Sequence, residues 1–448
     1  MINQSTPTLT KFDPGIIPFQ KKVLYDIRKG FDYSLGVHEI LLSGAVGSSK
    51  STVMSHIAIT HCLFNPGCRF LIGRLSMPAL RSTLFNKILE HIGNDLREGI
   101  DYWVNETTAS IRFRNGSEII SRSWADKKFF KVRSLELSGA AIEETVENEL
   151  SDFYYEIKMR VGRLPHVKEN IIINATNPGD PSHWLHKYFI ESKSPTRHVY
   201  YSVTTDNPFL PKQYVEQLKT DLDPKMAQRM LYGKWIEIKG ESLYYAYSEK
   251  NFKIAHYVIN EKYPIHIMWD FNIGVGKPMS CAVSQYIDDV WHIFDEVIIE
   301  GVRTTQIIEE LDEKKYLDGK YKIIINGDAS GKNRDTRNSK SDYDIIRHEL
   351  AKRGVQFEYH VPIANPPIRT RHNTVNAYCC NALGERRLFV YEKAKTVDEG
   401  FRLTKLKKGA DYIEDDSKSW QHVSTACGYG IMYEKLTKDR KPQGVIRL

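Results

Sequence analysis

Apolar residues along the chain follow two alternating patterns. Short runs rich in β-branched residues predict strands, and segments with an apolar residue every three or four positions predict helices between them. In the first half, strands are predicted at residues 40–42, 70–72, 118–120, 140–142 and 170–173, and helices at 78–92 and 147–161. Strands and helices that alternate in this way are typical of a mainly parallel sheet flanked by helices. The first half is therefore predicted to be an α/β domain.

The pattern changes near residue 240. A short strand is predicted from Lys234, Gly240 ends it, and a new series of strands begins at Ile265. We therefore predict two domains, residues 1–240 and residues 241–448. In the second, strands are predicted at residues 265–271, 279–285, 290–299, 322–326, 356–359 and 388–391, and helices at 304–316 and 343–352.

Composition narrows the class of protein. Of the 448 residues, 41% are hydrophobic and 27% charged, as in an ordinary folded, soluble chain. No apolar run approaches the ~20 residues of a membrane span, and the first residues do not resemble a signal peptide, so we expect a cytoplasmic protein with no membrane partner. The 63 Lys and Arg residues outnumber the 56 Asp and Glu residues, which permits a polyanionic partner.

The clearest chemical motif follows the first predicted strand. Residues 43–52 read SGAVGSSKST, with the Gly, Lys and Ser spacing of a Walker A loop. In such a loop backbone N–H groups bind phosphate, the lysine reaches the β- and γ-phosphates, and the hydroxyl after it binds Mg²⁺. Ser49 departs from the pattern, because a second glycine is usual there. The residues predicted to bind ATP in this loop are Gly44, Gly47, Ser48, Ser49, Lys50, Ser51 and Thr52.

Three other segments fit an ATPase site. Gln20 lies ahead of the loop, where many helicase-like ATPases hold the adenine. The strand at 140–142 ends in an acidic pair, so Glu143 is predicted to order Mg²⁺ and Glu144 to activate the attacking water. A helix that begins with exposed glutamates is the alternative. Thr176 and Asn177 follow the strand at 170–173, where they are placed either to respond to the γ-phosphate or to cap an ordinary turn.

Two aspartates end predicted strands of the second domain. Asp270 stands at the end of the strand that begins at Ile265, and Asp328 follows the strand at 322–326. If these strands are parallel neighbours, the carboxylates meet at one edge and hold Mg²⁺ or Mn²⁺ for phosphodiester cleavage. The alternative is that each aspartate caps a turn. Glu296 is a further carboxylate for the same edge, although alternating acids on a strand normally face solvent.

The order of these motifs resembles that of large terminase subunits, the DNA-packaging ATPases of tailed double-stranded DNA phages. The Walker A loop, the acidic pair and a strand that ends in Ala-Thr-Asn-Pro (175–178) carry the resemblance, and residues 69–85, 121–144 and 232–247 share it. It implies a P-loop ATPase domain followed by a ribonuclease H-like nuclease domain with a mixed sheet. It further implies ATP-driven translocation of double-stranded DNA into a procapsid and cutting of concatemeric DNA. The implied cofactors are Mg²⁺ with ATP and Mg²⁺ or Mn²⁺ at the nuclease site.

The resemblance also implies a third metal ligand on a late helix, in a segment similar to D-H-x-x-D-A-x-x-Y. Residues 420–429 keep the histidine, as His422, but Gln421 and Thr425 stand at the acidic positions. His422 is the predicted third ligand beside Asp270 and Asp328, and Asp415 and Asp416 are the alternatives. A site that binds its second metal only with DNA phosphate is another alternative.

The implied partners are double-stranded DNA, the small terminase subunit and the portal protein. The chain is expected to be a monomer in solution and a homo-oligomeric ring on the portal vertex of the procapsid, in the host cytoplasm. Two other hypotheses stay open: a helicase-like or transposition-associated DNA-dependent ATPase, and a decayed, non-catalytic homologue. The predicted DNA-backbone contacts are Lys332, Arg334, Arg337, Arg369, Arg371, Lys435, Lys438, Arg440 and Lys441, and the candidate arginine fingers are Arg74, Arg81, Arg160 and Arg163.

Overall fold

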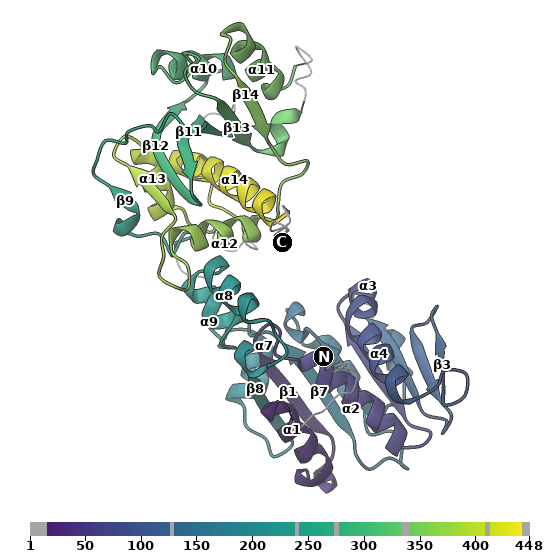
Figure 1. The fold of residues 1–448 in the computed structure, drawn as a ribbon. Coiled ribbons are helices and arrows are strands. Elements are labelled where there is room, and N and C mark those ends of the chain that lie inside the picture. The colour runs from purple at the N-terminus through teal and green to yellow at the C-terminus, as the bar shows by residue number, and fades with distance from the viewer. Residues whose placement is uncertain are drawn as a thin grey trace, which may run out of the picture. The chain divides into compact units, whose positions relative to one another are not determined.

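The chain forms two compact units, each with its own β-sheet (Figure 1). The computed structural model describes residues 16–125, 130–237, 242–272, 277–333, 340–407 and 413–440. Its contacts group Met1–Val215 with Gln228–Ile238 in one unit, and Glu216–Ala227 with Lys239–Leu448 in the other. The domain boundary predicted at residue 240 lies outside the described residues.

The first unit is built on an eight-stranded sheet with the order β3-β4-β5-β2-β6-β7-β1-β8. From β5 to β8 in that order every pair is parallel, and β3 and β4 form an antiparallel extension. The predicted mainly parallel sheet is therefore confirmed. The strands are β1 (His38–Gly44), β2 (Arg69–Arg74), β3 (Tyr102–Asn105), β4 (Ser110–Phe113), β5 (Glu118–Ser123), β6 (Gly139–Glu143), β7 (Ile171–Thr176) and β8 (Arg197–Ser202).

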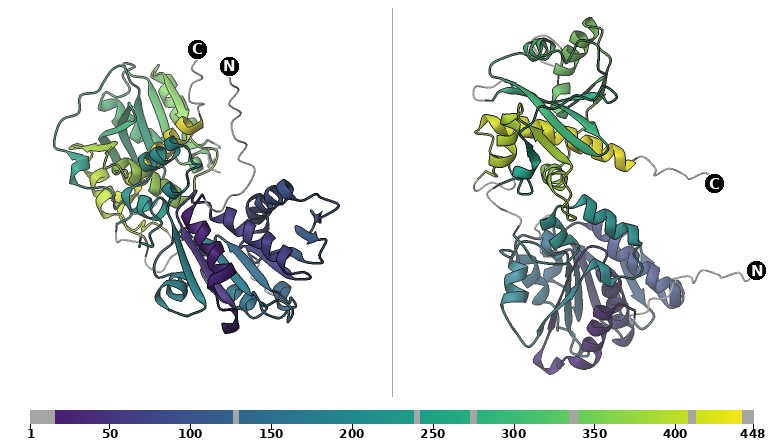
Figure 2. Two further views of the ribbon diagram at one scale, coloured as in Figure 1. Left: turned by 60° about the horizontal axis from the view of Figure 1, so that its bottom comes forward. Right: turned by 60° about the vertical axis from the view of Figure 1, so that its left-hand side comes forward.

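Helices cover both faces of this sheet, because alternate strand residues point to opposite faces (Figure 2). Ile40 and Leu42 of β1 pack with α1, α2 and α4, whereas Leu41 packs with α6 and α7. The helix predicted at 147–161 is shorter than expected and begins at Asp152. The helices are α1 (Pro18–Tyr25), α2 (Lys50–Phe64), α3 (Met77–Leu80), α4 (Asn86–Asp95), α5 (Phe130–Arg133), α6 (Asp152–Lys158) and α7 (Trp184–His186). Two further helices, α8 (Lys212–Asp221) and α9 (Pro224–Met230), each contain residues of both units.

The second unit contains a seven-stranded mixed sheet with the order β14-β13-β10-β11-β12-β15-β9. The β10–β11 and β11–β12 pairs are antiparallel and the other pairs are parallel, so the predicted mixed sheet is confirmed. Its strands are β9 (Phe252–Lys253), β10 (Ile265–Asp270), β11 (Met279–Ile287), β12 (Val290–Ile299), β13 (Ile323–Gly327), β14 (Phe357–His360) and β15 (Leu388–Tyr391).

The two faces of this second sheet carry different helices. Ile267 and Trp269 of β10 pack against α10 and α11, and Met268 packs on the opposite face with α12, α13 and α14. Asp270 therefore lies on the α14 face, two residues beyond Met268. The helices are α10 (Thr304–Glu313), α11 (Asp342–Lys352), α12 (Ile368–Cys379), α13 (Lys395–Leu403) and α14 (Ser419–Arg440).

The strand predicted from Lys234 is wrong within the described residues, because residues 233–237 form no strand. The side chain of Trp235 instead donates from Nε1 to Ser43 Oγ over 2.8 Å, which ties this segment to the end of β1. The hairpin of β3 and β4 and the strand β8 were not predicted, because their polar residues interrupt the apolar runs.

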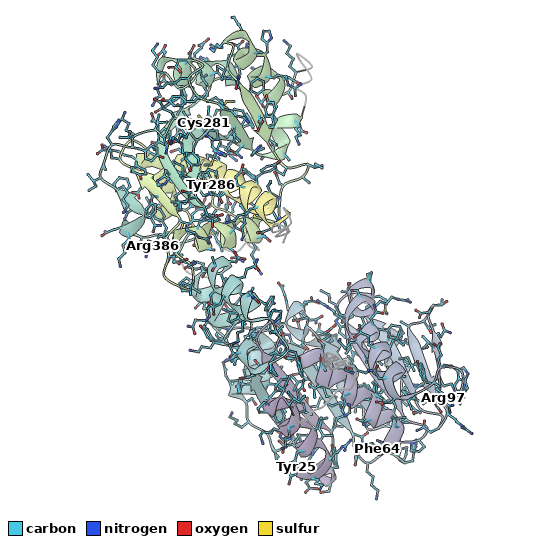
Figure 3. All side chains as sticks on the ribbon, in the orientation of Figure 1. Tyr25, Phe64, Arg97, Cys281, Tyr286 and Arg386 are labelled. Atoms are coloured by element: carbon cyan, nitrogen blue, oxygen red, sulfur yellow. The ribbon has the colours of Figure 1, made fainter. Side chains whose placement is uncertain are left out.

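The surface of the first unit carries single apolar side chains, such as the exposed Tyr25 and Phe64 (Figure 3). Arg28 lies over the ring of Phe64, 5.4 Å from its centroid. Scattered exposure of this kind is normal for a folded domain. Among the residues that the structure describes, no helix combines the length and the apolar character that a membrane crossing requires.

Close packing of α13 on α14 yields a stability prediction at Gly400. A Cβ there would lie 2.5 Å from the Trp420 carbonyl oxygen and 2.8 Å from Ser424 Cβ. We expect Gly400→Ala to lower the free energy of unfolding by about 1–3 kcal/mol, measured by chemical denaturation. Gly93→Ala on α4, where a Cβ meets nothing within 4 Å, is the matched control and should raise it by about 0.5–1 kcal/mol. Equal effects of both substitutions would contradict the packing argument.

Candidate functional site

The predicted Walker A loop connects the end of β1 to α2. Gly44 is required there because a Cβ would lie 2.0 Å from Ser202 Oγ. Ser49 adopts the left-handed conformation, with φ 64° and ψ 31°, at the position where glycine is usual. This conformation costs a non-glycine residue about 1–2 kcal/mol. Asn207 Nδ2 stabilises the turn by donating to Gly47 O (2.7 Å) and Ser49 Oγ (3.1 Å), so the loop keeps its form without the second glycine.

Lys50 turns back into the loop. Its Nζ donates to Gly44 O (2.8 Å), Ala45 O (2.7 Å) and Asn177 Oδ1 (3.0 Å). Burial lowers the pKa of Lys50 to about 8, although the charges of Glu144 and Glu143 oppose that effect. The ammonium group is thus held among acceptors that phosphate oxygens can replace.

Ser51 and Glu143, the predicted Mg²⁺ ligands, lie in direct contact. Ser51 Oγ donates to Glu143 Oε1 over 2.8 Å. The other carboxylate oxygen accepts from Thr83 and lies 3.6 Å from Arg74 Nη1. Hydroxyl and carboxylate oxygens are ligands that suit Mg²⁺. Glu143 ends β6 and is buried, so the alternative of a helix that begins with exposed glutamates is wrong at this residue.

Glu144, the predicted base, is the next residue and also lies in the left-handed region, at φ 44°. Asn177 links it to Lys50: the Asn177 backbone N–H donates to Glu144 Oε2 (3.4 Å), while Asn177 Oδ1 accepts from Lys50. Burial raises the pKa of the Glu144 carboxyl, although the Lys50 charge opposes it. A raised carboxyl pKa favours proton acceptance from water.

The remaining predicted residues brace this arrangement. Gln20 Nε2 donates to Ser49 O (3.0 Å), and Ser48 Oγ donates to Ala45 O (2.8 Å). Thr176 Oγ1 accepts from the Val146 N–H (3.3 Å), and Thr52 lies in the first turn of α2. The sequence offered no local signal for Thr83 and Asn207, which approach from distant segments.

The four arginine-finger candidates differ in their surroundings. Arg74 contacts Glu143 and forms two contacts with Glu147, at 3.1 and 2.5 Å. Arg81 donates to Thr107 O, Arg160 Nη2 lies 3.8 Å from Glu156 Oε2, and Arg163 is exposed.

Asp270 and Asp328 lie at the same edge of the second sheet. β10 and β13 are parallel neighbours in which Trp269 pairs with Gly327, so each aspartate follows one member of that pair. On the α14 face, His422 Nδ1 lies 3.1 Å from Asp270 Oδ2, and the Tyr429 hydroxyl donates to Asp328 Oδ2 over 3.4 Å. The structure therefore brings all three predicted metal ligands to one edge.

The alternative that Asp328 caps a turn is confirmed, because its side chain accepts from the Ser330 N–H at the start of the turn at residues 329–332. Asparagines also contact both aspartates. Asn272 Nδ2 donates to Asp270 Oδ2 (2.6 Å), and Asn365 Nδ2 donates to Asp328 Oδ1 (3.1 Å). His422 Nε2 is buried and has no hydrogen-bond partner among the described residues. Carboxylate oxygens and an imidazole nitrogen are donors that suit a divalent metal, but among the described residues no group of three His, Cys, Asp or Glu side chains is close enough to hold one.

The other acids proposed for this site are engaged elsewhere. Asp416 pairs with Lys277 Nζ (2.5 Å), and Asp415 accepts from the Ser417 N–H (3.1 Å). Glu296 accepts from the backbone N–H groups of residues 396 and 397, at 2.9 and 2.8 Å, at the start of α13. The prediction of Glu296 as a spare ligand is wrong, because its carboxylate caps a helix instead.

Of the predicted DNA contacts, the structure corrects Arg371. Arg371 is 3% exposed and pairs with Glu414, so it is not a surface contact. Lys435 pairs with Asp221, and Lys438 pairs with Asp289. Lys332 remains exposed, with its Nζ donating to Pro362 O (2.8 Å). Arg369 interacts with other groups of the protein. Arg334, Arg337, the side chain of Arg440 and Lys441 lie outside the described residues.

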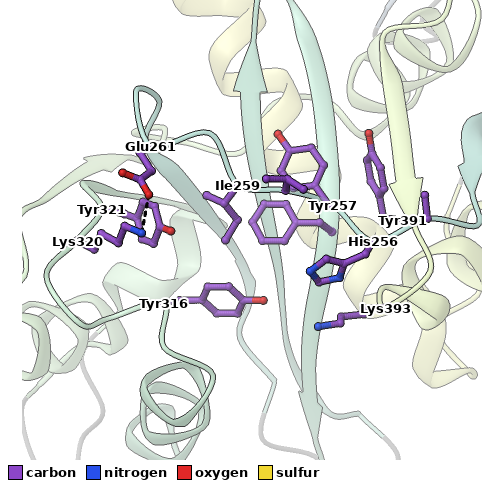
Figure 4. A pocket seen from close by; sticks show the side chains of 12 residues that line it. His256, Tyr257, Ile259, Glu261, Tyr316, Lys320, Tyr321, Tyr391 and Lys393 are labelled. Carbon is purple, nitrogen blue, oxygen red and sulfur yellow. Dashed lines mark ion pairs between the residues drawn. The ribbon is translucent and has the colours of Figure 1, made fainter.

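A pocket of about 330 Å³ on the second unit lies away from these carboxylates (Figure 4). It is lined by residues before the amino ends of β10 and β13, such as Tyr257 and Tyr316, whereas Asp270 and Asp328 lie at the carboxyl ends of these strands. Its charged residues Lys320 and Glu261 pair over 2.6 Å. None of the predicted site residues lines it.

Comparison with known proteins shows a similarity over the first unit. Residues 37–234, which contain the loop, the acidic pair and the Thr-Asn strand end, match the family model of the phage terminase large subunit. Over these residues the chain is similar to phage terminase large subunits. The large terminase subunit of phage PBSX from Bacillus subtilis (strain 168) is 27% identical over 200 residues, which span 40% of this chain and 44% of that protein.

Solved large terminases share the fold of both units. The large terminase of a thermophilic bacteriophage matches over 93% of this chain and 98% of its own, with a TM-score of 0.59 and 16% identity. The same phage protein in complex with ADP gives a TM-score of 0.58 with 17% identity, over the same shares of the two chains. The predicted fold class, α/β with a mainly parallel sheet followed by a mixed sheet, is confirmed, and both units have the fold of these large terminases.

The raised pKa of Glu144 yields a prediction about hydrolysis. Glu144→Gln keeps the shape but removes the proton acceptor, so ATP should still bind while turnover falls by about 10²-fold or more. In the unchanged chain, ATP hydrolysis should fall as the pH falls through the raised pKa, because the carboxyl is then protonated. Steady-state ATPase assays across pH measure both effects. The exposed neighbour Glu149 provides the control, Glu149→Gln, which should hydrolyse normally. Normal turnover in Glu144→Gln would assign the base to another residue.

The edge of the second sheet that carries Asp270 and Asp328 yields a prediction about DNA cleavage. Asp270→Ala and Asp328→Ala should be inactive, and His422→Ala strongly impaired, because each removes a predicted metal ligand. Asp416→Ala should cleave normally, because Asp416 pairs with Lys277. Cleavage should be faster with Mn²⁺ than with Mg²⁺, since imidazole favours the softer ion. A plasmid-nicking assay with each metal measures this. Full activity of His422→Ala with an inactive Asp416→Ala would show that Asp416, and not His422, is the third metal ligand.

Proposed function

We propose that this chain is the motor and nuclease of a phage DNA-packaging machine. The first unit hydrolyses ATP to translocate double-stranded DNA into a procapsid, and the second cuts concatemeric DNA with divalent metal. The proposal rests chiefly on one observation: Ser51 and Glu143 lie 2.8 Å apart beside Lys50 and Glu144, within the residues that match the phage terminase large subunit.

The contacts of the first site support hydrolysis rather than nucleotide binding alone. Ser51 and Glu143 offer oxygen ligands to the Mg²⁺ of Mg-ATP, and Lys50 carries charge for the phosphates. Glu144, oriented by Asn177, takes the proton of the attacking water. Asn177 touches both Lys50 and Glu144, so it is the residue through which loss of the γ-phosphate reaches the base.

The donor set of the second site supports metal-dependent cleavage. Asp270, Asp328 and His422 would hold Mg²⁺ or Mn²⁺, which supplies Lewis-acid activation of water and stabilises the leaving oxygen. Two aspartates carry only two negative charges, so a second divalent ion is incompletely neutralised by the protein. It binds weakly until DNA phosphate arrives. Weak occupancy at rest suits a nuclease that must not cut during translocation.

The partners follow from this function. We propose double-stranded DNA as substrate, the small terminase subunit as the partner that selects the packaging site, and the portal protein of the procapsid as the docking platform. The chain is then a monomer in solution and a homo-oligomeric ring at the portal vertex, in the host cytoplasm. The exposed Lys332, which follows Asp328 closely, is a candidate contact to the DNA backbone.

A portal experiment tests the function. Procapsids that carry the portal should stimulate ATP hydrolysis and DNA uptake by the chain. Lys50→Ala should abolish both, because the phosphate-binding cation is lost, while Mn²⁺-dependent cleavage persists. Lys21→Ala, at an exposed lysine of α1, is the control and should package normally.

Other outcomes of that experiment would replace the proposal. Hydrolysis that responds to DNA but not to procapsids would favour the helicase-like or transposition-associated ATPase. Complete absence of both hydrolysis and cleavage would favour a decayed homologue. Loss of cleavage in Lys50→Ala would contradict the independence of the two activities.

A further inference from the structure

A buried carboxylate, Glu414, lies beside the two helix positions at which acids were expected. Glu414 is 8% exposed and precedes α14. It accepts hydrogen bonds from Gln421 and Thr425, the latter over 2.9 Å. Gln421 and Thr425, the two neutral residues on the helix, are therefore joined by the carboxylate of Glu414 from the preceding segment.

The second oxygen of Glu414 faces α12. Arg371 and His372 both donate to Glu414 Oε1. A carboxylate has about four lone-pair sites, and here four groups donate to it. Burial alone would raise the pKa of Glu414, but the hydrogen bond from His372 and the charge of Arg371 outweigh it and lower the pKa to about 2. Glu414 is thus ionised and fully engaged, and so differs from a metal ligand awaiting its ion.

Arg371 connects Glu414 to the sheet edge that carries Asp270 and Asp328. Its guanidinium lies 4.5 Å from the centroid of the Tyr429 ring, and the Tyr429 hydroxyl donates to Asp328. Gly428 permits this approach, because a Cβ there would lie 3.1 Å from Arg371 Cδ. On the same helix, Gln421 immediately precedes His422, whose Nδ1 faces Asp270. Both parts of the network therefore end at residues that contact the two aspartates.

We propose that Glu414 is a positioning residue of the nuclease site, an inference that rests on the function proposed for that site. By joining the first turns of α14 to α12, it holds His422 and Tyr429 against Asp270 and Asp328. Glu414, which is not itself a proposed ligand, thus orients the ligands from a position beside Gln421 and Thr425. Outer-shell partners of this kind commonly change metal affinity by about 10–100-fold when removed.

Mn²⁺ binding to the full-length chain tests this role. Free Mn²⁺ is measured by electron paramagnetic resonance, and the Asp270→Ala chain, measured in parallel, accounts for binding at other sites. Glu414→Gln should weaken Asp270-dependent binding by about 10–100-fold and leave ATP hydrolysis unchanged. Combining Glu414→Gln with Gln421→Glu returns a carboxylate to the network, and this double variant should recover most of the lost affinity.

The outcomes separate positioning from simple stabilisation. Unchanged Mn²⁺ affinity in Glu414→Gln would overturn the proposal, and so would a double variant that regains the thermal stability but not the affinity. If Glu414→Gln does not fold, Thr425→Val removes one hydrogen bond and keeps the ion pair; it should weaken Mn²⁺ binding, and unchanged affinity would again overturn the proposal. Absence of Asp270-dependent binding in the unchanged chain would instead overturn the nuclease function itself.

Discussion

Both candidate sites depend on parallel strands that end together. In the first unit, β7 lies between β1 and β6, so the phosphate loop, Asn177 and the acidic pair emerge at one edge. In the second unit, β10 and β13 are direct neighbours whose last paired residues are Trp269 and Gly327. Because side chains alternate between faces, the next residue of each strand points to the side that α14 covers. Sheet geometry therefore collects residues that are far apart in the sequence.

The parts of the sites that follow strands could be predicted from the sequence. Lys50, Glu143, Asp270 and Asp328 each stand next to a recognisable apolar run, and a strand end has a defined place in a parallel sheet. Ser49 looked like a defect of the loop, yet its left-handed conformation shows that the glycine position is preserved in geometry. The contact between Lys50 and Asn177 required the order of β1 and β7 as well.

The contacts that depend on packing between distant segments could not be predicted. Arg371 looked like a surface cation, because a sequence shows its charge but not its contact with the buried Glu414. Thr83 lies on Glu143 because a π-helical turn, η3 (Arg81–Phe85), brings it there, and no local pattern marks that turn. Glu296 resembled a spare ligand because strand position alone does not reveal that α13 begins beside it. Burial and side-chain direction decided each of these cases.

The self-contacts of Lys50 bear on how such a motor empties its site. The ammonium group donates hydrogen bonds to two carbonyls of its own loop and to Asn177, so the cation has hydrogen-bond acceptors within the protein. In the proposed ATPase, these acceptors would replace part of the interaction energy when phosphate contacts are lost. A cation that can return to internal acceptors would then favour release of the product over tight retention of spent nucleotide.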